Sequence, residues 1–543
     1  MTASVLNRDL RQTRSPWWLA GLLLAVAVAF ALRLPRLGER PMHADESVHA
    51  IKFVRLLDEG RYAYDPHEYH GPSLYYFTLP FVLAAGERTG DEVTEATLRL
   101  VPLAFGVALI LLLPLTGSLL GRGATVAAGL LLAVSPAMVY YSRYFIHELL
   151  LVVFTWLWIA GAWRWWKSRR LPWLLLSGAA LGLMHATKET FVFNLVAAMP
   201  ALVIAWWWER KSIPDGSDVR GVFPALGLGA LVVLVVSFLF FTSFFTHEKG
   251  LLQGPLDSIR TYVPWITRAG GESPHVHPWS FYFERLLWWR HGEGPVFTEL
   301  FVAVLALVGM VAAFTRRGLG SDSCTAFIRF LALYTLTLMA IYTVISYKTP
   351  WCLLGWYHGI VLLAGVGVAA LWQWLRPVRA KVVLTVGLLA GVAHLSQEAC
   401  RAAFTYAAEP ANPWVYAHTS RDLLRLVERV QGVAGHHPDP GRMVVKVVAP
   451  GGDYWPLPWY LRNLPNVGYY AAVPEDPFAD AVIMGSRISV PLDDMSEKKW
   501  IMAGYYNLRP KVFLSFYPKF DLWRSYIESL PPPVDEDEDE DGE

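Results

Sequence analysis

The sequence predicts an all-α polytopic membrane protein with a small α/β domain near its C-terminus, and three observations support this. Hydrophobic residues make up 54% of the 543 residues and charged residues only 17%, whereas soluble proteins average about 25% charged residues. The hydrophobic residues gather in runs long enough to cross a bilayer, which takes roughly 17–25 residues each. After about residue 397 these runs stop, and short helix and strand patterns follow.

About eleven runs are predicted to be transmembrane helices. They are residues 17–34, 98–120, 124–141, 146–163, 172–186, 191–208, 222–245, 297–314, 326–346, 353–374 and 382–396. A further apolar stretch, 73–85, is short for a span and is predicted to re-enter the membrane or lie on its surface. Lys and Arg fall in short clusters between the runs, which excludes a basic nucleic-acid surface.

The positions of these basic clusters predict the orientation of the chain. We place the N-terminus, with Arg8, Arg11 and Arg14, in the cytoplasm and treat 73–85 as not crossing. Every concentrated basic cluster between spans then lies in a cytoplasmic loop, whereas all of them would lie outside if 73–85 crossed. These clusters contain Arg122; Arg164, Lys167, Arg169 and Arg170; Arg210 and Lys211; Arg316 and Arg317; and Arg376, Arg379 and Lys381.

The C-terminal region is predicted to be a small α/β domain outside the membrane. Residues 421–430 have helical periodicity, 443–448 and 481–483 have strand patterns, and 521–530 suggest a last helix. The proline-led acidic tail, 531–543, is predicted to be disordered.

A polar motif follows the first predicted span on the outer side. Residues 43–49 are HADESVH, with Asp45 and Glu46 adjacent. Two carboxylates held close together raise the pKa of one of them, which suits a general base near neutral pH. The alternative is an acidic helix start in a hydrated loop, with no chemical role.

Ionisable residues also stand at the outer ends of other predicted spans. Ionisable groups at membrane depth are functional candidates. Long side chains that merely anchor helix ends explain any one of them, but explain less well why they share a side with the carboxylate motif. The residues are Arg99, Arg143, His147, Glu148, Lys188, Glu189 and Lys348.

Taken in order, these motifs resemble a family of membrane enzymes. Asp45-Glu46 after the first span, His-Gly-Pro at 70–72, Arg99-Leu100, and Ser142-Arg143 followed by Glu148 resemble GT-C fold glycosyltransferases. The closest type is the protein O-mannosyltransferase and aminoarabinose-transferase superfamily (glycosyltransferase family 39-like). The motifs HADESVH, YKTPW at 347–351 and YWPLPWY at 454–460 are similar to its prokaryotic branch named flippase-associated glycosylation proteins.

The resemblance implies a domain order. It begins with a cytoplasmic N-terminus (1–15) and a conserved GT-C membrane module (16–250) that has a first outer loop (35–97). A second large outer loop (246–296) and variable transmembrane helices (297–397) follow. The chain then has an extracytoplasmic α/β domain (398–530) and the acidic tail (531–543). The chain is then a multi-pass protein of the plasma (inner) membrane, with its active site outside the cytoplasm.

The resemblance also implies a reaction. Such enzymes transfer a sugar, with inversion, from a polyprenyl-phosphate carrier to an acceptor outside the membrane. The sugar and the acceptor, which is a protein, lipid or glycan, stay open. Asp45 would be the general base, and Glu46 would orient it or the sugar. Arg99 would meet the carrier phosphate, with help from Arg143 and Lys188.

Other residues are substrate-binding candidates, and no cofactor is expected. The histidines of the first loop would position substrate or pack the loop; their irregular spacing does not favour a divalent metal held with Asp45 and Glu46. The aromatic motif at 347–351 fits an interfacial belt, and 453–460 fits a docking surface. The remaining substrate-binding candidates are His43, His49, His70, Glu148, Glu189 and Lys348.

Two other functions stay open at this point. One is a non-enzymatic flippase or transporter component for lipid-linked sugars, which should show repeated halves and a polar site at mid-membrane. The other is an en bloc oligosaccharide transferase, which should have a metal site and a peptide-binding outer domain.

Overall fold

The structure is a computed structural model that describes residues 16–67, 70–209, 222–247, 250–270, 275–488 and 499–531. The predicted cytoplasmic N-terminus and nearly all of the predicted acidic tail lie outside these residues. The chain divides into two compact units. One contains Met1–Glu39 and Lys52–Tyr416, and the other contains Arg40–Ile51 and Ala417–Glu543.

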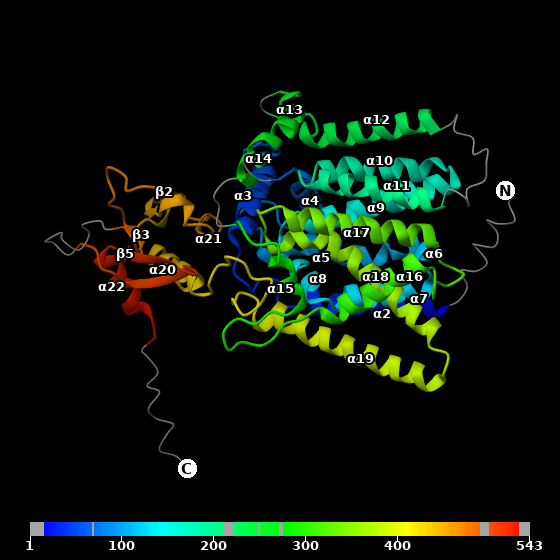
Figure 1. The fold of residues 1–543 in the computed structure, drawn as a ribbon. Helices are drawn as coiled ribbons and strands as arrows, with labels where there is room; N and C mark the ends of the chain where they lie inside the picture. The colour runs from blue at the N-terminus through cyan, green and yellow to red at the C-terminus, as the bar shows by residue number, and fades with distance from the viewer. Residues whose placement is uncertain are drawn as a thin grey trace, which may run out of the picture. The chain divides into compact units, whose positions relative to one another are not determined.

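The first unit is helical, and its long helices lie side by side (Figure 1). Among the neighbouring pairs, α16 packs on α18, α9 on α10, and α7 on both α2 and α18, while α12 packs on α10 at one edge. The helices are α2 (Pro16–Arg33), α4 (Ser73–Ala85), α5 (Glu95–Leu111), α6 (Gly117–Leu120), α7 (Arg122–Val134), α8 (Pro136–Tyr141), α9 (Glu148–Ser168), α10 (Leu171–His185), α11 (Phe191–Glu209), α12 (Val222–Phe241), α13 (Gln253–Arg260), α14 (Tyr262–Gly270), α15 (Phe281–Leu287), α16 (Leu300–Thr315), α17 (Thr325–Val344), α18 (Leu354–Trp374) and α19 (Val378–Cys400). Helix α3 (Ala44–Glu59) contributes residues to both units.

Seven helical stretches in the described part of the chain are long and apolar enough to cross a membrane. They are Glu95–Leu120, Glu148–Ser168, Phe191–Trp208, Val222–Phe241, Thr325–Val344, Pro350–Trp374 and Val378–Thr405. The other four predicted spans fall on shorter apolar helices, Trp17–Arg33, Arg122–Val134, Leu171–His185 and Leu300–Thr315. An all-α polytopic membrane fold is therefore confirmed, and how many helices cross stays a prediction.

Helix α4 coincides with the apolar stretch that was predicted not to cross. It has 13 residues, so it is about 20 Å long, against a hydrocarbon core of about 30 Å. The helix ends at Gly86, which has a left-handed φ of 85° and donates its N–H to the Leu83 carbonyl. Its length supports the prediction that it does not span the bilayer.

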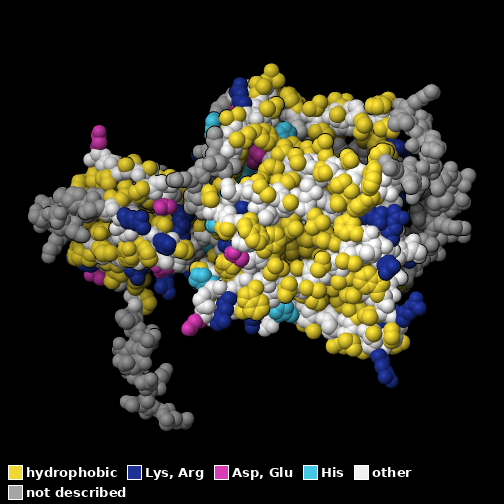
Figure 2. Space-filling view, in the orientation of Figure 1, with side chains coloured by type: hydrophobic (Ala, Val, Ile, Leu, Met, Phe, Trp, Pro, Cys, Tyr) yellow, Lys and Arg dark blue, Asp and Glu magenta, His cyan; other side chains and the backbone are white. Residues whose placement is uncertain are grey.

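The loops that carry basic residues meet at one end of the first unit. The backbone N–H of Arg122 donates to Asp322 (2.8 Å), and Lys167 Nζ contacts Cys324 Sγ at 3.4 Å. Figure 2 shows Lys and Arg side chains gathered at the end of the helices where α6 and α7 lie, and hydrophobic side chains over their middle. This grouping is what the positive-inside argument requires of loops on a common side.

The second unit contains a five-stranded sheet with the order β2-β1-β3-β5-β4. Strands β2, β1 and β3 are parallel, while β5 is antiparallel to both β3 and β4. The small C-terminal α/β domain is confirmed, and α20, β1, β3 and α22 fall on the four predicted elements. The elements are α20 (Asp422–Gly435), β1 (Val444–Val448), α21 (Leu457–Tyr460), β2 (Asn466–Tyr470), β3 (Ala481–Gly485), β4 (Gly504–Arg509), β5 (Val512–Pro518) and α22 (Phe520–Ser529).

Two glycines bring α16 and α18 into backbone contact. A Cβ on Gly309 would lie 2.0 Å from the Leu363 carbonyl oxygen, and one on Gly367 would lie 1.9 Å from that of Leu305. Small residues let membrane helices approach closely, and van der Waals packing then holds the pair together. The α16–α18 contact therefore requires glycine at both positions.

We expect Gly367→Val to destabilise the protein by about 1–3 kcal/mol, because the added carbons force the two backbones apart. Gly387→Val in α19 is the matched control, since a Cβ there meets nothing within 4 Å. Thermal unfolding of the purified protein in detergent measures both. Equal unfolding temperatures for the two variants would contradict the close packing.

Candidate active site

The adjacent carboxylates at the start of α3 have different surroundings. Glu46 is fully buried and accepts hydrogen bonds from Arg40 Nη2 (2.9 Å) and from the backbone N–H of His43 (3.0 Å), one on each oxygen. The Asp45 side chain is 36% exposed. The adjacency in sequence predicted coupling between the two carboxylates; in the structure Arg40 balances the Glu46 charge, and Asp45 keeps an open side.

His43 supports the backbone of Asp45. The Asp45 N–H donates to His43 Nδ1 (3.0 Å), and the His43 ring stacks on His418 with centroids 5.7 Å apart. Burial lowers the pKa of His43, against the opposing effect of the Asp45 and Glu46 charges. A neutral ring with an unprotonated Nδ1 is the form that can accept this hydrogen bond.

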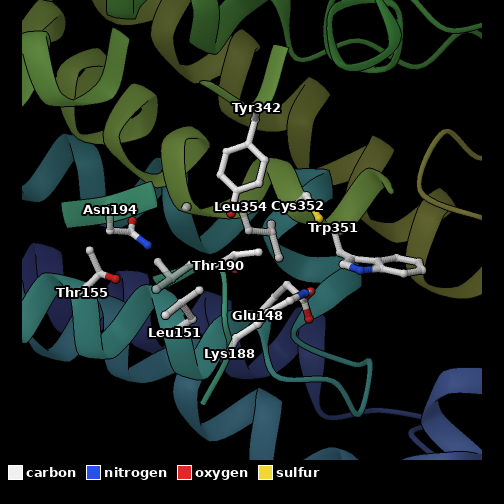
Figure 3. A pocket seen from close by; sticks show the side chains of 12 residues that line it. Glu148, Leu151, Thr155, Lys188, Thr190, Asn194, Tyr342, Trp351, Cys352 and Leu354 are labelled. Atoms are coloured by element: carbon white, nitrogen blue, oxygen red, sulfur yellow. The ribbon is translucent and has the colours of Figure 1, made fainter. Parts of the chain in front are cut away.

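In the first unit, Glu148 and Lys188 form a buried ion pair. Glu148 begins α9 and Lys188 lies between α10 and α11, so the pair joins two helix ends. Figure 3 shows both side chains beside a cavity of about 20 Å³ that Tyr342 and Cys352 also line. This volume is enough for about one water molecule, so the cavity as it stands does not hold a sugar.

The His-Gly-Pro motif of the first loop is attached to the same junction. Gly71 donates its N–H to the Thr187 carbonyl (3.1 Å), and a Cβ on Gly71 would lie 2.3 Å from the Ala186 carbonyl oxygen. His147 Nε2 donates to the Gly71 carbonyl (2.9 Å). Glycine is therefore required by a close backbone approach.

His70 of this motif pairs with Glu189. Nδ1 of His70 is 2.8 Å from Glu189 Oε2, and the His70 ring stacks on Trp265 at 5.4 Å. The Tyr64 hydroxyl donates to the other Glu189 oxygen (3.3 Å). Burial raises the pKa of Glu189. Sequence-predicted residues from three segments thus meet in one polar cluster.

Arg99 and Arg143, which were predicted to meet the carrier phosphate, contact backbone carbonyls. Arg143 donates to the carbonyls of Arg33, Pro35 and Arg36 at 2.5–3.0 Å, and Arg99 donates to the Leu37 carbonyl at 2.6 Å. Both therefore hold the chain that leaves α2.

Arg33, which lies inside an apolar run, was missed by the sequence analysis. It donates to the Ser142 hydroxyl (3.1 Å) and to the carbonyls of Leu132 and Ala133 (2.8 and 2.7 Å). A charge at the end of an apolar run was the signal that could have found it.

The predicted residue Lys348 lies in a second basic group, which also includes His277 and Arg285. Lys348 Nζ donates to the His277 carbonyl (3.2 Å), and His277 Nε2 lies 2.8 Å from the Tyr416 hydroxyl. Arg285, another residue that the sequence analysis missed, lies over the Phe281 ring at 3.7 Å, and His277 stacks on the same ring. Burial, with the nearby Arg285, His275 and Lys348, lowers the pKa of His277 to about 4.

The two aromatic motifs are more buried than predicted. Trp351 is 7% exposed and packs against Tyr144 and Tyr416, so it is not a membrane-facing belt residue. In the second motif Trp459 is fully buried, and the Tyr460 hydroxyl accepts the N–H of Met42 at 2.8 Å. Burial and this contact reduce the docking surface expected there.

No group of three or more His, Cys, Asp or Glu side chains in the described ranges is placed to hold a metal ion.

Two further histidines of the first loop differ in exposure. His49 is buried in the second unit. Exposed His67 donates its backbone N–H to Asp65 (2.8 Å).

Comparisons with known proteins find one matching family model and several similar solved structures. A family model for dolichyl-phosphate-mannose-protein mannosyltransferases matches residues 77–243. The structure of ArnT from Cupriavidus metallidurans bound to undecaprenyl phosphate is similar, with a TM-score of 0.61 and 14% identity over 96% of this chain and 100% of that one. No curated protein matches.

An Archaeoglobus fulgidus oligosaccharyltransferase tethered to an acceptor peptide is also similar. Its TM-score is 0.54 at 12% identity, and the alignment covers 85% of this chain but 64% of that one. The predicted fold is confirmed: the chain is an integral membrane protein with the GT-C fold.

We expect Lys188→Met to destabilise the protein by about 3–5 kcal/mol, because it leaves the Glu148 carboxylate buried and unpaired. The double variant with Glu148→Gln should recover most of that loss, since both charges are then removed. Thermal unfolding of the single and double variants in detergent measures the coupling. Additive losses would show that the pair does not stabilise the fold.

Proposed function

We propose that this chain, which has the GT-C fold, transfers a sugar from a polyprenyl-phosphate carrier to an acceptor outside the membrane. The observation that carries the proposal is the difference between its two adjacent carboxylates. Arg40 and a backbone N–H occupy both oxygens of Glu46, whereas the Asp45 carboxylate has an exposed edge at a helix start. A base that takes a proton from an incoming hydroxyl needs such an open side.

The proposed donor is a lipid-linked phosphate sugar. The matching family model is described by a dolichyl-phosphate donor, and the similar ArnT structure contains undecaprenyl phosphate. The cations Arg285 and Lys348 would stabilise the charge that grows on the leaving phosphate, because fixed cations near developing charge lower the barrier. Arg99 and Arg143 contribute charge as well, since the carbonyls they contact are neutral acceptors.

The proposed reaction is a single displacement. Asp45 takes the proton of the acceptor hydroxyl, the hydroxyl oxygen attacks the anomeric carbon, and the bond from that carbon to the phosphate oxygen breaks. The bonding electrons leave with the phosphate, so no separate general acid is required. Attack from the opposite face inverts the anomeric centre. Glu46 keeps the helix start in place, and the site faces outward from the inner membrane.

We expect Asp45→Asn to lower sugar transfer by at least about 100-fold, because general-base catalysis contributes roughly 10²–10⁴-fold. Glu59→Gln is the matched control, since Glu59 ends the same helix with an exposed side chain. Transfer from a radiolabelled polyprenyl-phosphate-hexose pool in proteoliposomes measures both variants.

The same assay separates the competing function. If wild type and Asp45→Asn move the labelled lipid between leaflets equally well and neither yields a glycosylated product, a flippase component replaces the transferase. Equal transfer by wild type and Asp45→Asn would instead remove Asp45 as the base.

We further propose that transfer needs no divalent metal. Both Glu46 oxygens accept hydrogen bonds from protein donors, so a metal on Glu46 would compete with Arg40 and the His43 N–H. We expect EDTA treatment to change the transfer rate by less than about twofold, since most enzyme sites with a catalytic metal have several protein ligands. Loss of transfer that Mg²⁺ or Mn²⁺ restores would contradict this.

A further inference from the structure

Residues 40–51, which carry the HADESVH motif, belong to the same compact unit as the C-terminal domain. They are separated from that domain by more than 350 residues in sequence. Two specific contacts with the C-terminal domain lie just before Asp45, at Met42 and His43.

The first contact holds the backbone before the motif. The Met42 N–H donates to the Tyr460 hydroxyl at 2.8 Å. Tyr460 ends α21 and packs against the hydrophobic core of the second unit, which includes Leu457 and Leu461. The hydroxyl is therefore held in place by the folded domain.

The second contact holds the ring that supports Asp45. His43 and His418 stack with an angle of 8° between their planes, and both are buried. Two residues after His418, Ser420 donates its N–H to the Leu508 carbonyl of β4 (2.8 Å). The sheet thus fixes His418, which contacts His43, and His43 Nδ1 accepts the Asp45 N–H.

We propose that Tyr460 and His418 are positioning residues for Asp45, and that the C-terminal domain is therefore part of the active site. The inference rests on the proposed function, in which Asp45 is the base. A catalytic group must be held to within a fraction of an ångström by its supporting residues. Tyr460 fixes the backbone before Asp45, and His418 fixes the His43 ring that accepts the Asp45 N–H.

The test uses Tyr460→Phe in the full-length protein in nanodiscs. The change removes one hydroxyl and leaves the Met42 N–H without its acceptor. We expect kcat to fall roughly tenfold, with an unchanged KM for the polyprenyl-phosphate-hexose donor, and amide hydrogen exchange to rise in the peptide that contains Met42. In an Asp45→Asn background the same change should have no further effect on the residual rate.

Tyr469→Phe is the matched control, because Tyr469 packs against the same core from β2. It should leave both kcat and hydrogen exchange unchanged. His418→Leu puts a side chain of similar size in the buried position but removes the ring that stacks on His43, and it should act in the direction of Tyr460→Phe.

Each outcome decides a separate point. Unchanged exchange in Tyr460→Phe overturns the contact, and raised exchange with unchanged kcat overturns the positioning role. A fall in kcat that is equally large in the Asp45→Asn background also overturns it, because the effect then does not act through Asp45. If wild type transfers no sugar, the proposed function fails, while hydrogen exchange still decides whether the domain holds the motif.

Discussion

The described part of the structure depends on partners for charges that folding withdraws from water. An unpaired ion in a low-dielectric interior costs several kcal/mol, and a partner must offset that cost. Lys188 is paired with Glu148, Arg40 with Glu46, and Arg33 with two backbone carbonyls. Each of these contacts except Arg40–Glu46 also joins segments far apart in sequence, so the same interactions that compensate charge hold the helix ends together.

This requirement distinguishes two carboxylates that are neighbours in sequence. Glu46 points into the interior, where Arg40 and a backbone N–H accompany it. Asp45, one residue earlier on the helix, points about 100° away and keeps an exposed edge. Helical geometry therefore buries one carboxylate beside Arg40 and leaves the other exposed.

The transmembrane fold was predictable because apolar runs report directly on burial in lipid. Residues 124–141 show the limit of this pattern: the run is continuous, yet Ser135 and Pro136 divide it into α7 and α8, because proline lacks the N–H that a continuous helix requires. In the C-terminal domain, β2 was missed. Its sequence NVGYY is partly exposed on an edge of the sheet, so neither alternation nor a hydrophobic run marks it.

For the candidate site, residue types could be predicted but partners could not. The sequence analysis identified Glu148 and Lys188, and it also identified His70 and Glu189, as ionisable residues on one side. Which atoms meet depends on helix packing, and no local pattern encodes that. Tyr460 illustrates the point, because its aromatic motif indicated a docking surface, whereas its hydroxyl is used to hold Met42.

Three histidines, two in the first loop and one at the start of α9, each use a ring nitrogen to hold another part of the chain. His43 uses Nδ1 for the Asp45 N–H, His70 uses Nδ1 for Glu189, and His147 uses Nε2 for the Gly71 carbonyl. Each ring thus attaches a different part of the chain. The contacts of His70 and His147 hold the His-Gly-Pro segment of the first loop, and the contact of His43 holds the backbone of Asp45.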